Sequence, residues 1–371
     1  MKVGFDGKRA TQNITGLGNY SRYLIRLLTK FHPHNQFLIY AITIPPPELA
    51  ISEVEYRYPG KQLIKSYWRS FGIIKNLLRD NIDLFHGLSN EIPYSLKTAG
   101  IPTVVTIHDL IFIRYPQYYS FIDRLIYKYK YRYAALHADK VIAISKQTKQ
   151  DLMHYFGVNE DKIEVIYQDC DVIFHQQVTS LMKDEIKKKY QLPEKYLLNV
   201  GTIEERKNLM LIAKALLRID NIHLVVVGRE TKYTLTVKQF IKQNQLSERV
   251  HFLHNVAHCD LPAIYQHAEL LIYPSRFEGF GIPIVEALHS GIPVIAAKGS
   301  CLEEAGGPGS IYIDPDDDVE LAKQVKGIID NNETKMKMVR MGKQYLDNFK
   351  SKLISDQTIH LYQNVIDNAK R

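Results

Sequence analysis

The stretch SRFEGFGIPIVE, residues 275–286, decides the fold of this 371-residue chain. The apolar run 270–273 before it is typical of a buried parallel strand. Pro283 suits the start of a helix, Gly291 suits its end, and the apolar run 293–297 predicts the next strand. Strand, glycine turn, helix and strand form the repeating unit of a doubly wound α/β domain.

Two carboxylates flank the glycine turn of this stretch. Glu278 follows the strand and Glu286 lies in the first turns of the helix, with Gly279, Phe280 and Gly281 between them. Glycine lets the backbone approach a ligand closely, and N–H groups at a helix N-terminus favour an anion. Carboxylates favour hydroxyl groups. The pattern therefore predicts a ligand with phosphates in its middle and polyols at both ends, which describes a nucleotide sugar.

The Glu-x7-Glu spacing around this turn resembles the donor-site motif of the family 4 retaining glycosyltransferases, and matching context extends over nearly the whole chain. The resemblance implies the GT-B architecture, in which two doubly wound Rossmann-like α/β domains face a cleft. It implies that Glu278 meets the donor sugar and Glu286 the ribose. We expect an acceptor-side domain formed by residues 1–172 with a C-terminal helix 353–371, and a donor-binding domain formed by residues 173–352.

A second basic and polar loop follows the predicted strand 196–200. Arg206 and Lys207 stand beside the predicted N-terminus of a helix, for which Asn208 suits the N-cap. Two cations beside a helix N-terminus favour an anion. In the resemblance this is the diphosphate-binding position, although many family members carry an arginine where this chain has Thr202. We therefore expect Arg206 and Lys207, with Glu278, to act in the reaction.

Further site residues come from the resemblance. It implies that Gly16 and Gly18, in a loop after the first strand, lie near the donor phosphates and the acceptor. It implies that His108, at the end of the predicted strand 103–107, contacts the donor sugar, and we count it with the catalytic residues. It also implies that Glu304 helps to hold the nucleotide. His86 ends another predicted strand, and it is either a second polar site residue or a structural histidine.

No metal or separate cofactor is expected. The triplet Asp169-Cys170-Asp171 spells D-x-D, a metal motif of the other major glycosyltransferase fold, but it follows the last predicted strand of the first domain. In the resembled family the chain crosses between domains there. Three scattered cysteines argue against a disulfide framework or a zinc site and suit a reducing cytosol.

The positive charge is concentrated in the N-terminal half. The chain carries +8, and residues 1–170 hold 22 basic against 15 acidic residues. This basic half could bind an anionic partner, namely nucleic acid, acidic lipid or a phosphorylated acceptor. Alternatively, its basic residues could simply form a solvated surface without a partner. The basic amphipathic segment 63–78 could lie on a membrane or pack on the sheet. The aromatic and basic segment 115–133 fits one helix with mixed faces better than a nucleic-acid surface, so we expect no nucleic-acid partner. Contact of this segment with the acceptor or with a membrane is a further alternative.

The hydropathy of the chain and its N-terminal segment also predict where the protein is located in the cell. It contains no apolar run long enough to span a membrane, and Met1–Asp6 predicts a strand rather than a signal peptide. We therefore expect a cytoplasmic protein, and peripheral contact with the anionic inner membrane face is one of the alternatives that the basic charge leaves open.

The segments 108–116 and 201–208 resemble bacterial mannosyltransferases of cell-surface polysaccharide assembly. The resemblance favours GDP-mannose as the donor and a saccharide or polyprenyl-linked acceptor, with a UDP-hexose as the alternative donor. Two other classes stay open, namely a sugar-nucleotide epimerase or phosphorylase on the same fold and a catalytically silent sugar-nucleotide-binding protein.

Overall fold

The computed structural model describes residues 1–60 and 67–370, and these form two compact units. The first unit comprises residues 1–168 and 349–371, and the second comprises residues 169–348. The chain thus passes between units after Gln168 and after Asn348, slightly earlier than the expected boundaries at 172 and 352.

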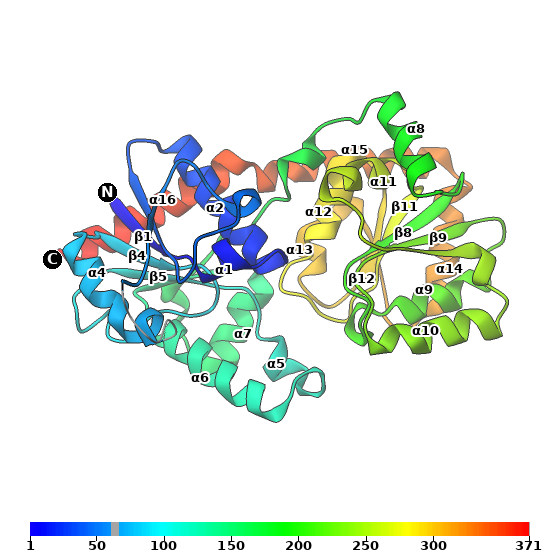
Figure 1. Ribbon diagram of the computed structural model, residues 1–371. Helices are drawn as coiled ribbons and strands as arrows, with labels where there is room; N and C mark the ends of the chain where they lie inside the picture. The colour runs from blue at the N-terminus through cyan, green and yellow to red at the C-terminus, as the bar shows by residue number, and fades with distance from the viewer. Residues whose placement is uncertain (61–66, 371) are drawn as a thin grey trace. The chain divides into compact units, whose positions relative to one another are not determined.

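Seven parallel strands form the sheet of the first unit, as far as the described residues show, in the order β3-β2-β1-β4-β5-β6-β7 (Figure 1). The strands are β1 (Lys2–Asp6), β2 (Gln36–Tyr40), β3 (Glu55–Arg57), β4 (Leu84–Gly87), β5 (Thr103–Ile107), β6 (Lys140–Ala143) and β7 (Ile163–Val165). The strand order reverses between β1 and β4, which pair in parallel. In such sheets the crevice beyond the carboxyl ends at this reversal is the usual ligand position.

Helices cover both faces of this sheet. One group contains α1 (Lys8–Gln12), α2 (Gly16–Phe31) and α16 (Ser351–Ala369), and α16 packs on α2. The other contains α4 (Ile73–Arg79), α5 (Ile111–Arg114), α6 (Phe121–His137) and α7 (Lys146–Phe156). Serine side chains cap two of these helices, because Ser120 accepts from the backbone N–H of Asp123 and Ser145 from that of Thr148.

The second unit has a six-stranded parallel sheet with the order β10-β9-β8-β11-β12-β13. Its strands are β8 (Tyr196–Val200), β9 (His223–Val227), β10 (Val250–Leu253), β11 (Leu270–Tyr273), β12 (Val294–Ala297) and β13 (Ile311–Ile313). The order reverses between β8 and β11, so the loops after these two strands flank the ligand position of the sheet.

Two helix layers enclose the second sheet as well (Figure 1). One layer contains α9 (Leu209–Leu216), α10 (Lys232–Gln243) and α14 (Asp318–Ile329), and the other contains α8 (Ser180–Lys189), α11 (Leu261–His267), α12 (Ile282–Ser290) and α15 (Asn332–Tyr345). The short α13 (Leu302–Gly306) packs against α12. The predicted fold class, two doubly wound α/β units, is therefore confirmed.

Both sheets are buried on both faces, which explains their apolar strands. Strand residues such as Val105, Val226 and Ile272 are fully buried within the two cores. Among the described helices, none combines the length and the apolar character that crossing a membrane requires.

Part of the predicted basic helix 63–78 falls on residues 61–66, outside the described residues. The described part consists of a π-helical turn, η2 (Trp68–Gly72), followed by α4. Trp68 and Leu77 are fully buried. This part of the segment therefore packs on the sheet, which was the second of the two predicted alternatives.

Candidate functional site

The carboxylate of Glu278 lies at the centre of a buried ionic cluster in the second unit. Lys207 Nζ lies 2.5 Å from its Oε1, and Arg206 NH1 lies 2.8 Å from its Oε2. The Tyr273 hydroxyl donates to Oε1 at 3.1 Å. Glu278 is only 9% exposed. The structure therefore joins three predicted site residues at the β8–β11 reversal.

The ionised state of Glu278 depends on its two cationic neighbours. Burial alone would raise the pKa of the carboxyl group, but the charges and hydrogen bonds of Lys207 and Arg206 lower it to about 2. Burial lowers the pKa of Lys207, and Glu278 opposes that effect. The Arg206 guanidinium also pairs with Glu204 at 2.5 Å and donates to the backbone carbonyl of Phe277. Both cations are thus fixed in place before any ligand binds.

The cap of α9 differs from the prediction. Asn208 precedes the helix with a left-handed backbone, φ 59°, and its side chain makes no capping hydrogen bond. Its amide donates instead to the carbonyl oxygens of Pro274 and Pro315, at 3.4 and 2.7 Å. Asn208 therefore ties the loop after β8 to the loops after β11 and β13, and the first turn of α9 has no side-chain cap.

Gly281 is required by backbone geometry and by packing. Its φ is 117°, and a Cβ at this position would lie 2.9 Å from Leu302 and 3.5 Å from Ala305, both on α13. Glu304, between them in the sequence, is half-buried, so α13 carries it beside the glycine turn. The close approach at Gly281 is thus to α13.

The rest of the glycine turn is anchored from within the unit. The Phe280 side chain is 2% exposed and packs into the interior of the unit, and its role at the donor stays a prediction. The Cys301 thiol donates to the carbonyl oxygens of Glu278 and Phe280, at 3.1 and 3.3 Å. The α12 helix then begins without a side-chain cap and with Pro283 in its first turn. Pro283 has no backbone N–H, and that of Ile284 donates to the carbonyl oxygen of Gly281 at 2.9 Å. The N–H of Ile282 at the helix start remains suited to an anion.

Glu286 is held by Tyr265, and its charge state differs from a simple expectation. The Tyr265 hydroxyl donates to Glu286 Oε2 at 2.5 Å. A position near a helix N-terminus favours an ionised carboxylate. Burial nevertheless outweighs this and raises the pKa of Glu286 to about 7, against the lowering effects of Tyr265 and His258. The carboxyl group is thus poised to be protonated or ionised near neutral pH.

This shift predicts a pH-dependent stability difference. Below pH 4.5 the carboxyl is protonated in the folded and unfolded chains, whereas above pH 7 the folded protein bears the cost of a buried charge. Glu286→Gln should therefore raise the free energy of unfolding at pH 8 by on the order of 1–3 kcal/mol. The gain should shrink steadily as the pH falls to 5. Urea unfolding measures it, with the exposed Glu185→Gln as control, and a pH-independent difference would contradict the shift.

The two aspartates of the D-x-D triplet have different partners. Both oxygens of Asp169 are engaged by histidines, Oδ1 by His289 at 3.0 Å and Oδ2 by His175 at 3.2 Å, and these two rings stack at 3.9 Å. Asp171 pairs with His258 instead, at 3.2 Å. One ligand atom each from Asp169, Cys170, His175 and His289 lies within 4.8 Å of the others, a donor set of a type that zinc accepts. The paired-aspartate geometry of D-x-D is thus not formed, and the expectation of no metal stays a prediction.

In the first unit, the predicted glycine loop is instead helical. Residues 8–12 form α1, and Gly16 and Gly18 lie in the first turn of α2. A Cβ on Gly18 would lie 1.8 Å from the carbonyl oxygen of Asn13, so packing alone requires glycine there, whereas Gly16 has open space. The expected loop is therefore wrong, and a donor role for the two glycines stays a prediction.

His108 follows β5 and is 6% exposed. Its Nε2 donates to the carbonyl oxygen of Leu88 at 2.9 Å, and the Tyr20 ring meets its ring edge-on at 4.6 Å. Burial lowers the pKa of His108 to about 4, so the imidazole is neutral at pH 7 and Nδ1 is its acceptor nitrogen. Its role at the donor sugar stays a prediction.

His86 belongs to the core of the first unit. It is fully buried, with Nδ1 2.5 Å from the Tyr362 hydroxyl on α16 and Nε2 2.8 Å from Thr106 Oγ1. Burial lowers the pKa of His86 to about 3. Because both ring nitrogens are used within the unit, the structural alternative for His86 is the better one.

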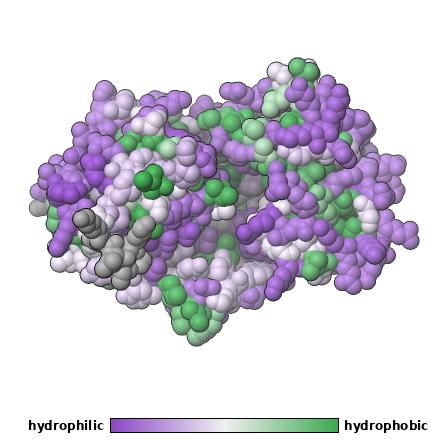
Figure 2. Space-filling model, in the orientation of Figure 1, coloured by the Kyte–Doolittle hydropathy of each residue, from purple (hydrophilic) through white to green (hydrophobic). Residues whose placement is uncertain are grey.

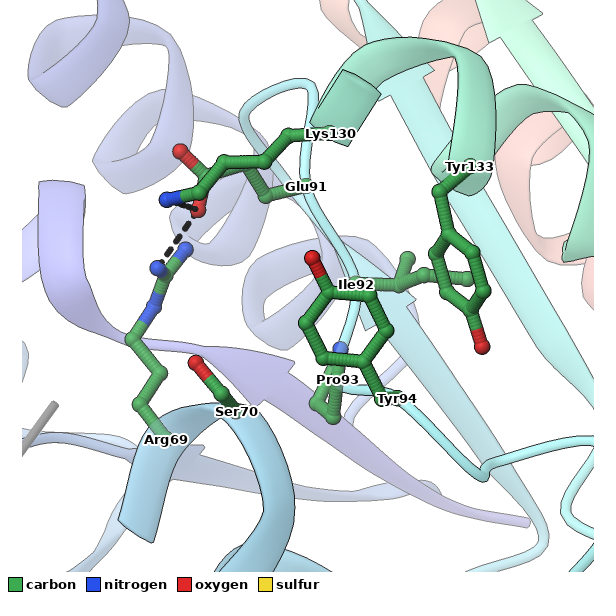
Figure 3. Close-up of a pocket in the computed structure, with 8 residues that line it drawn as sticks. All are labelled: Arg69, Ser70, Glu91, Ile92, Pro93, Tyr94, Lys130 and Tyr133. Atoms are coloured by element: carbon green, nitrogen blue, oxygen red, sulfur yellow. Dashed lines mark hydrogen bonds and ion pairs between the residues drawn. The ribbon is translucent and has the colours of Figure 1, made fainter. Parts of the chain in front are cut away.

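Sequence reasoning missed an ionic cluster at the carboxyl end of β1. Arg69 pairs with Asp6 at 2.5 Å and with Glu91 at 2.7 Å, and Lys130 reaches Glu91 at 3.3 Å, as Figure 3 shows for Arg69, Glu91 and Lys130. The amphipathic pattern of 63–78 indicated only a basic outer face.

Tyr273, Tyr265 and Cys301 were also missed, because single aromatic and thiol residues carry no spacing signal.

Comparison with known proteins agrees with this arrangement. Residues 182–345 match the family model for glycosyl transferases group 1, and residues 14–171 match that for glycosyltransferase family 4. The chain is 30% identical over 288 residues to the O-antigen chain mannosyltransferase RfbU of Salmonella typhimurium, covering 77% of this chain and 76% of that protein. It is 28% identical to O-antigen chain mannosyltransferase B of Escherichia coli, with the same coverage of each chain.

Solved structures share the fold. A glycosyltransferase from Rickettsia africae aligns with a TM-score of 0.78 at 17% identity, over 99% of both chains. HepE of Anabaena, solved in complex with UDP and glucose, aligns with a TM-score of 0.78 at 18% identity, over 98% of this chain and all of that one. With the two family models and the RfbU similarity, the chain belongs to family 4 of the glycosyltransferases.

Proposed function

We propose that the protein transfers a hexose from a nucleotide sugar to an acceptor hydroxyl in surface polysaccharide biosynthesis, with mannose from GDP-mannose as the favoured donor and a saccharide or polyprenyl-linked acceptor. The observation that carries the proposal is the Lys207–Arg206–Glu278 cluster beside the uncapped start of α12. The names of the two O-antigen mannosyltransferase relatives support mannose. A UDP-hexose is the second candidate, because HepE was solved with UDP-glucose.

The cluster fits the charge changes of such a reaction. As the bond from the sugar to the diphosphate breaks, negative charge grows on the leaving group. Lys207, Arg206 and the N–H at the start of α12 stabilise that charge, which is the electrostatic effect that usually contributes most to catalysis. Glu278 accepts from the hydroxyls of the transferred sugar, and Glu286 from those of the ribose. The sugar is transferred with retention at its anomeric carbon.

A panel of nucleotide sugars tests the proposal. We expect GDP-mannose to raise the melting temperature more than UDP-glucose or UDP-galactose, and GDP to be released when a lipid-linked saccharide is added. Selective stabilisation by the uridine nucleotides would favour the UDP-hexose alternative. Stabilisation without transfer would indicate the silent binding protein, conversion of the free donor would indicate an epimerase, and no stabilisation by any member would reject the proposal.

We also propose that the reaction needs no metal, because Lys207 and Arg206 stabilise the charge of the leaving group that a metal ion would otherwise stabilise. Turnover should then persist in excess EDTA. The matched measurement compares wild type with Asp171→Asn in EDTA and in manganese. Loss of turnover in EDTA that manganese restores in the wild type would contradict the proposal. If manganese then failed to restore Asp171→Asn, Asp169 and Asp171 would return to the role of metal ligands.

A further inference from the structure

One face of α6 exposes an unusual set of large apolar side chains. Those of Phe121, Ile122, Leu125, Ile126 and Tyr129 are 69, 68, 53, 45 and 64% exposed. They recur at one-, three- and four-residue steps, which places them along one side of the helix. Contiguous apolar patches of this kind on a protein surface usually mark an interaction site.

The helix that carries this face is firmly packed. Ala134 and Ala135 are fully buried against the first unit. Lys130 pairs with Glu91 at 3.3 Å, and the Tyr133 ring lies 4.6 Å from the Tyr94 ring, beside one another in Figure 3. The apolar face is therefore presented outward by a fixed helix.

Basic residues run beside the apolar ones. Arg124, Lys128 and Arg132 follow one another at four-residue spacing, and Lys128 and Arg132 are exposed. A shallow groove of about 520 Å³ runs along this face, lined by Leu125, Lys128, Tyr129, Arg132, Tyr133, Leu136 and His137. In Figure 2 hydrophobic residues gather at the lower edge of the first unit, where Figure 1 draws α6. Such a face suits a partner that is both apolar and anionic.

We propose that this α6 face, Phe121 to His137, docks on the surface of an anionic lipid bilayer. The apolar side chains enter the headgroup boundary while Lys128 and Arg132 meet lipid phosphates. A second copy of the chain fits less well, because each copy carries +8 and would bring the same basic row to the contact. The inference rests on the proposed function, in which a polyprenyl-linked acceptor is held in the membrane.

The apolar part is tested with Phe121→Ser, Ile122→Ser and Leu125→Ser combined in one variant. Wild type should sediment with vesicles of phosphatidylglycerol and phosphatidylcholine at low salt, and the triple variant should bind them at least about tenfold more weakly. These side chains are exposed, so the variant should fold, and its melting temperature checks that it does.

The matched control removes equally exposed apolar side chains from the second unit. Leu181, Leu235 and Val319 are 69, 69 and 55% exposed, close to the values of the three α6 residues. Their combined replacement by serine should leave vesicle binding unchanged. Equal losses in both triple variants would overturn the assignment of binding to α6.

The charge part is tested with Lys128→Gln combined with Arg132→Gln. Binding to the anionic vesicles should fall about thirtyfold and become less sensitive to salt. Lys188→Gln combined with Lys242→Gln removes two exposed lysines of the second unit and should have little effect. Equal binding of wild type to pure phosphatidylcholine vesicles would contradict the role of the basic row.

Two results would overturn the proposal as a whole. One is no binding of wild type to the anionic vesicles at low ionic strength. The other is a wild-type dimer in sedimentation equilibrium that the α6 triple variant abolishes, which would make the face a contact between copies. The affinity for the nucleoside diphosphate, measured by calorimetry, tests the proposed function separately. We expect this affinity to be unchanged in every α6 variant.

Discussion

Replacing Lys207 and Arg206 together by alanine is expected to lower the affinity for the nucleoside diphosphate at least tenfold, while nucleoside affinity barely changes. Each side chain would contribute a charge-assisted hydrogen bond to the phosphates, worth about 1.5–3 kcal/mol. Calorimetric titration with the nucleoside diphosphate and the nucleoside measures the difference. Equal loss for both ligands would mean that the two cations do not face the phosphates.

The structure adds a stability cost to this experiment. Lys207 and Arg206 neutralise buried Glu278, so the double variant leaves that carboxylate unpaired, at a cost on the order of 3–5 kcal/mol. Adding Glu278→Gln removes the unpaired charge and should restore stability without restoring phosphate affinity. If affinity returns with stability, the loss came from unfolding rather than from the missing cations.

A control of matched chemistry uses Arg218 and Lys187, which pair with Asp318 and Glu194 elsewhere in the second unit. Their double alanine variant also loses two cations. It should bind the nucleoside diphosphate like wild type, because neither residue lies beside the β8–β11 reversal.

The second large effect separates the two glutamates. Glu278→Gln should leave nucleoside diphosphate affinity intact or slightly tighter, because the variant no longer neutralises Lys207 and Arg206. Turnover should fall at least about a hundredfold, because the lost contact acts on the transferred sugar as the transition state forms. Glu286→Gln should instead weaken the nucleoside diphosphate and the donor alike, since both carry the ribose.

Affinity by calorimetry and the rate of sugar transfer, both for the two variants and for wild type, check this pattern. In Glu286→Gln the amide oxygen can still accept from Tyr265, and in Glu278→Gln it can still accept from Lys207. The geometry of the site is therefore largely preserved in both variants. The opposite pattern, in which Glu278→Gln weakens the nucleotide and Glu286→Gln spares it, would show that the donor lies in the reverse direction.

The fold was predictable because local signals agree with it. The apolar runs at 270–273 and 293–297 became β11 and β12, and Gly291 ends α12 in the left-handed conformation, φ 73°. The same signals placed Glu278 at a strand end. Gly18 shows the limit of such signals. It lies in a helix where a loop was expected, and glycine is needed there because a Cβ would lie 1.8 Å from the carbonyl oxygen of Asn13.

The ionic cluster was predictable only in part. Arg206 and Glu278 are far apart in sequence and meet because β8 pairs with β11, a pairing that the sequence does not state. Three-dimensional packing brings Glu278 against Arg206 and Lys207, whose charges it neutralises. It also buries Glu286, which raises the pKa of that carboxyl group to about 7. The roles of Tyr273 and Cys301 likewise appear only once the glycine turn is folded against them.

The most direct test is a crystal structure of the protein with the nucleoside diphosphate that it binds most tightly. We predict that the β-phosphate lies within hydrogen-bonding distance of Lys207 Nζ or the Arg206 guanidinium, beside the first turn of α12, and that the ribose hydroxyls meet Glu286. A nucleotide bound away from this cluster, or one whose ribose meets Glu278 instead, would contradict the account.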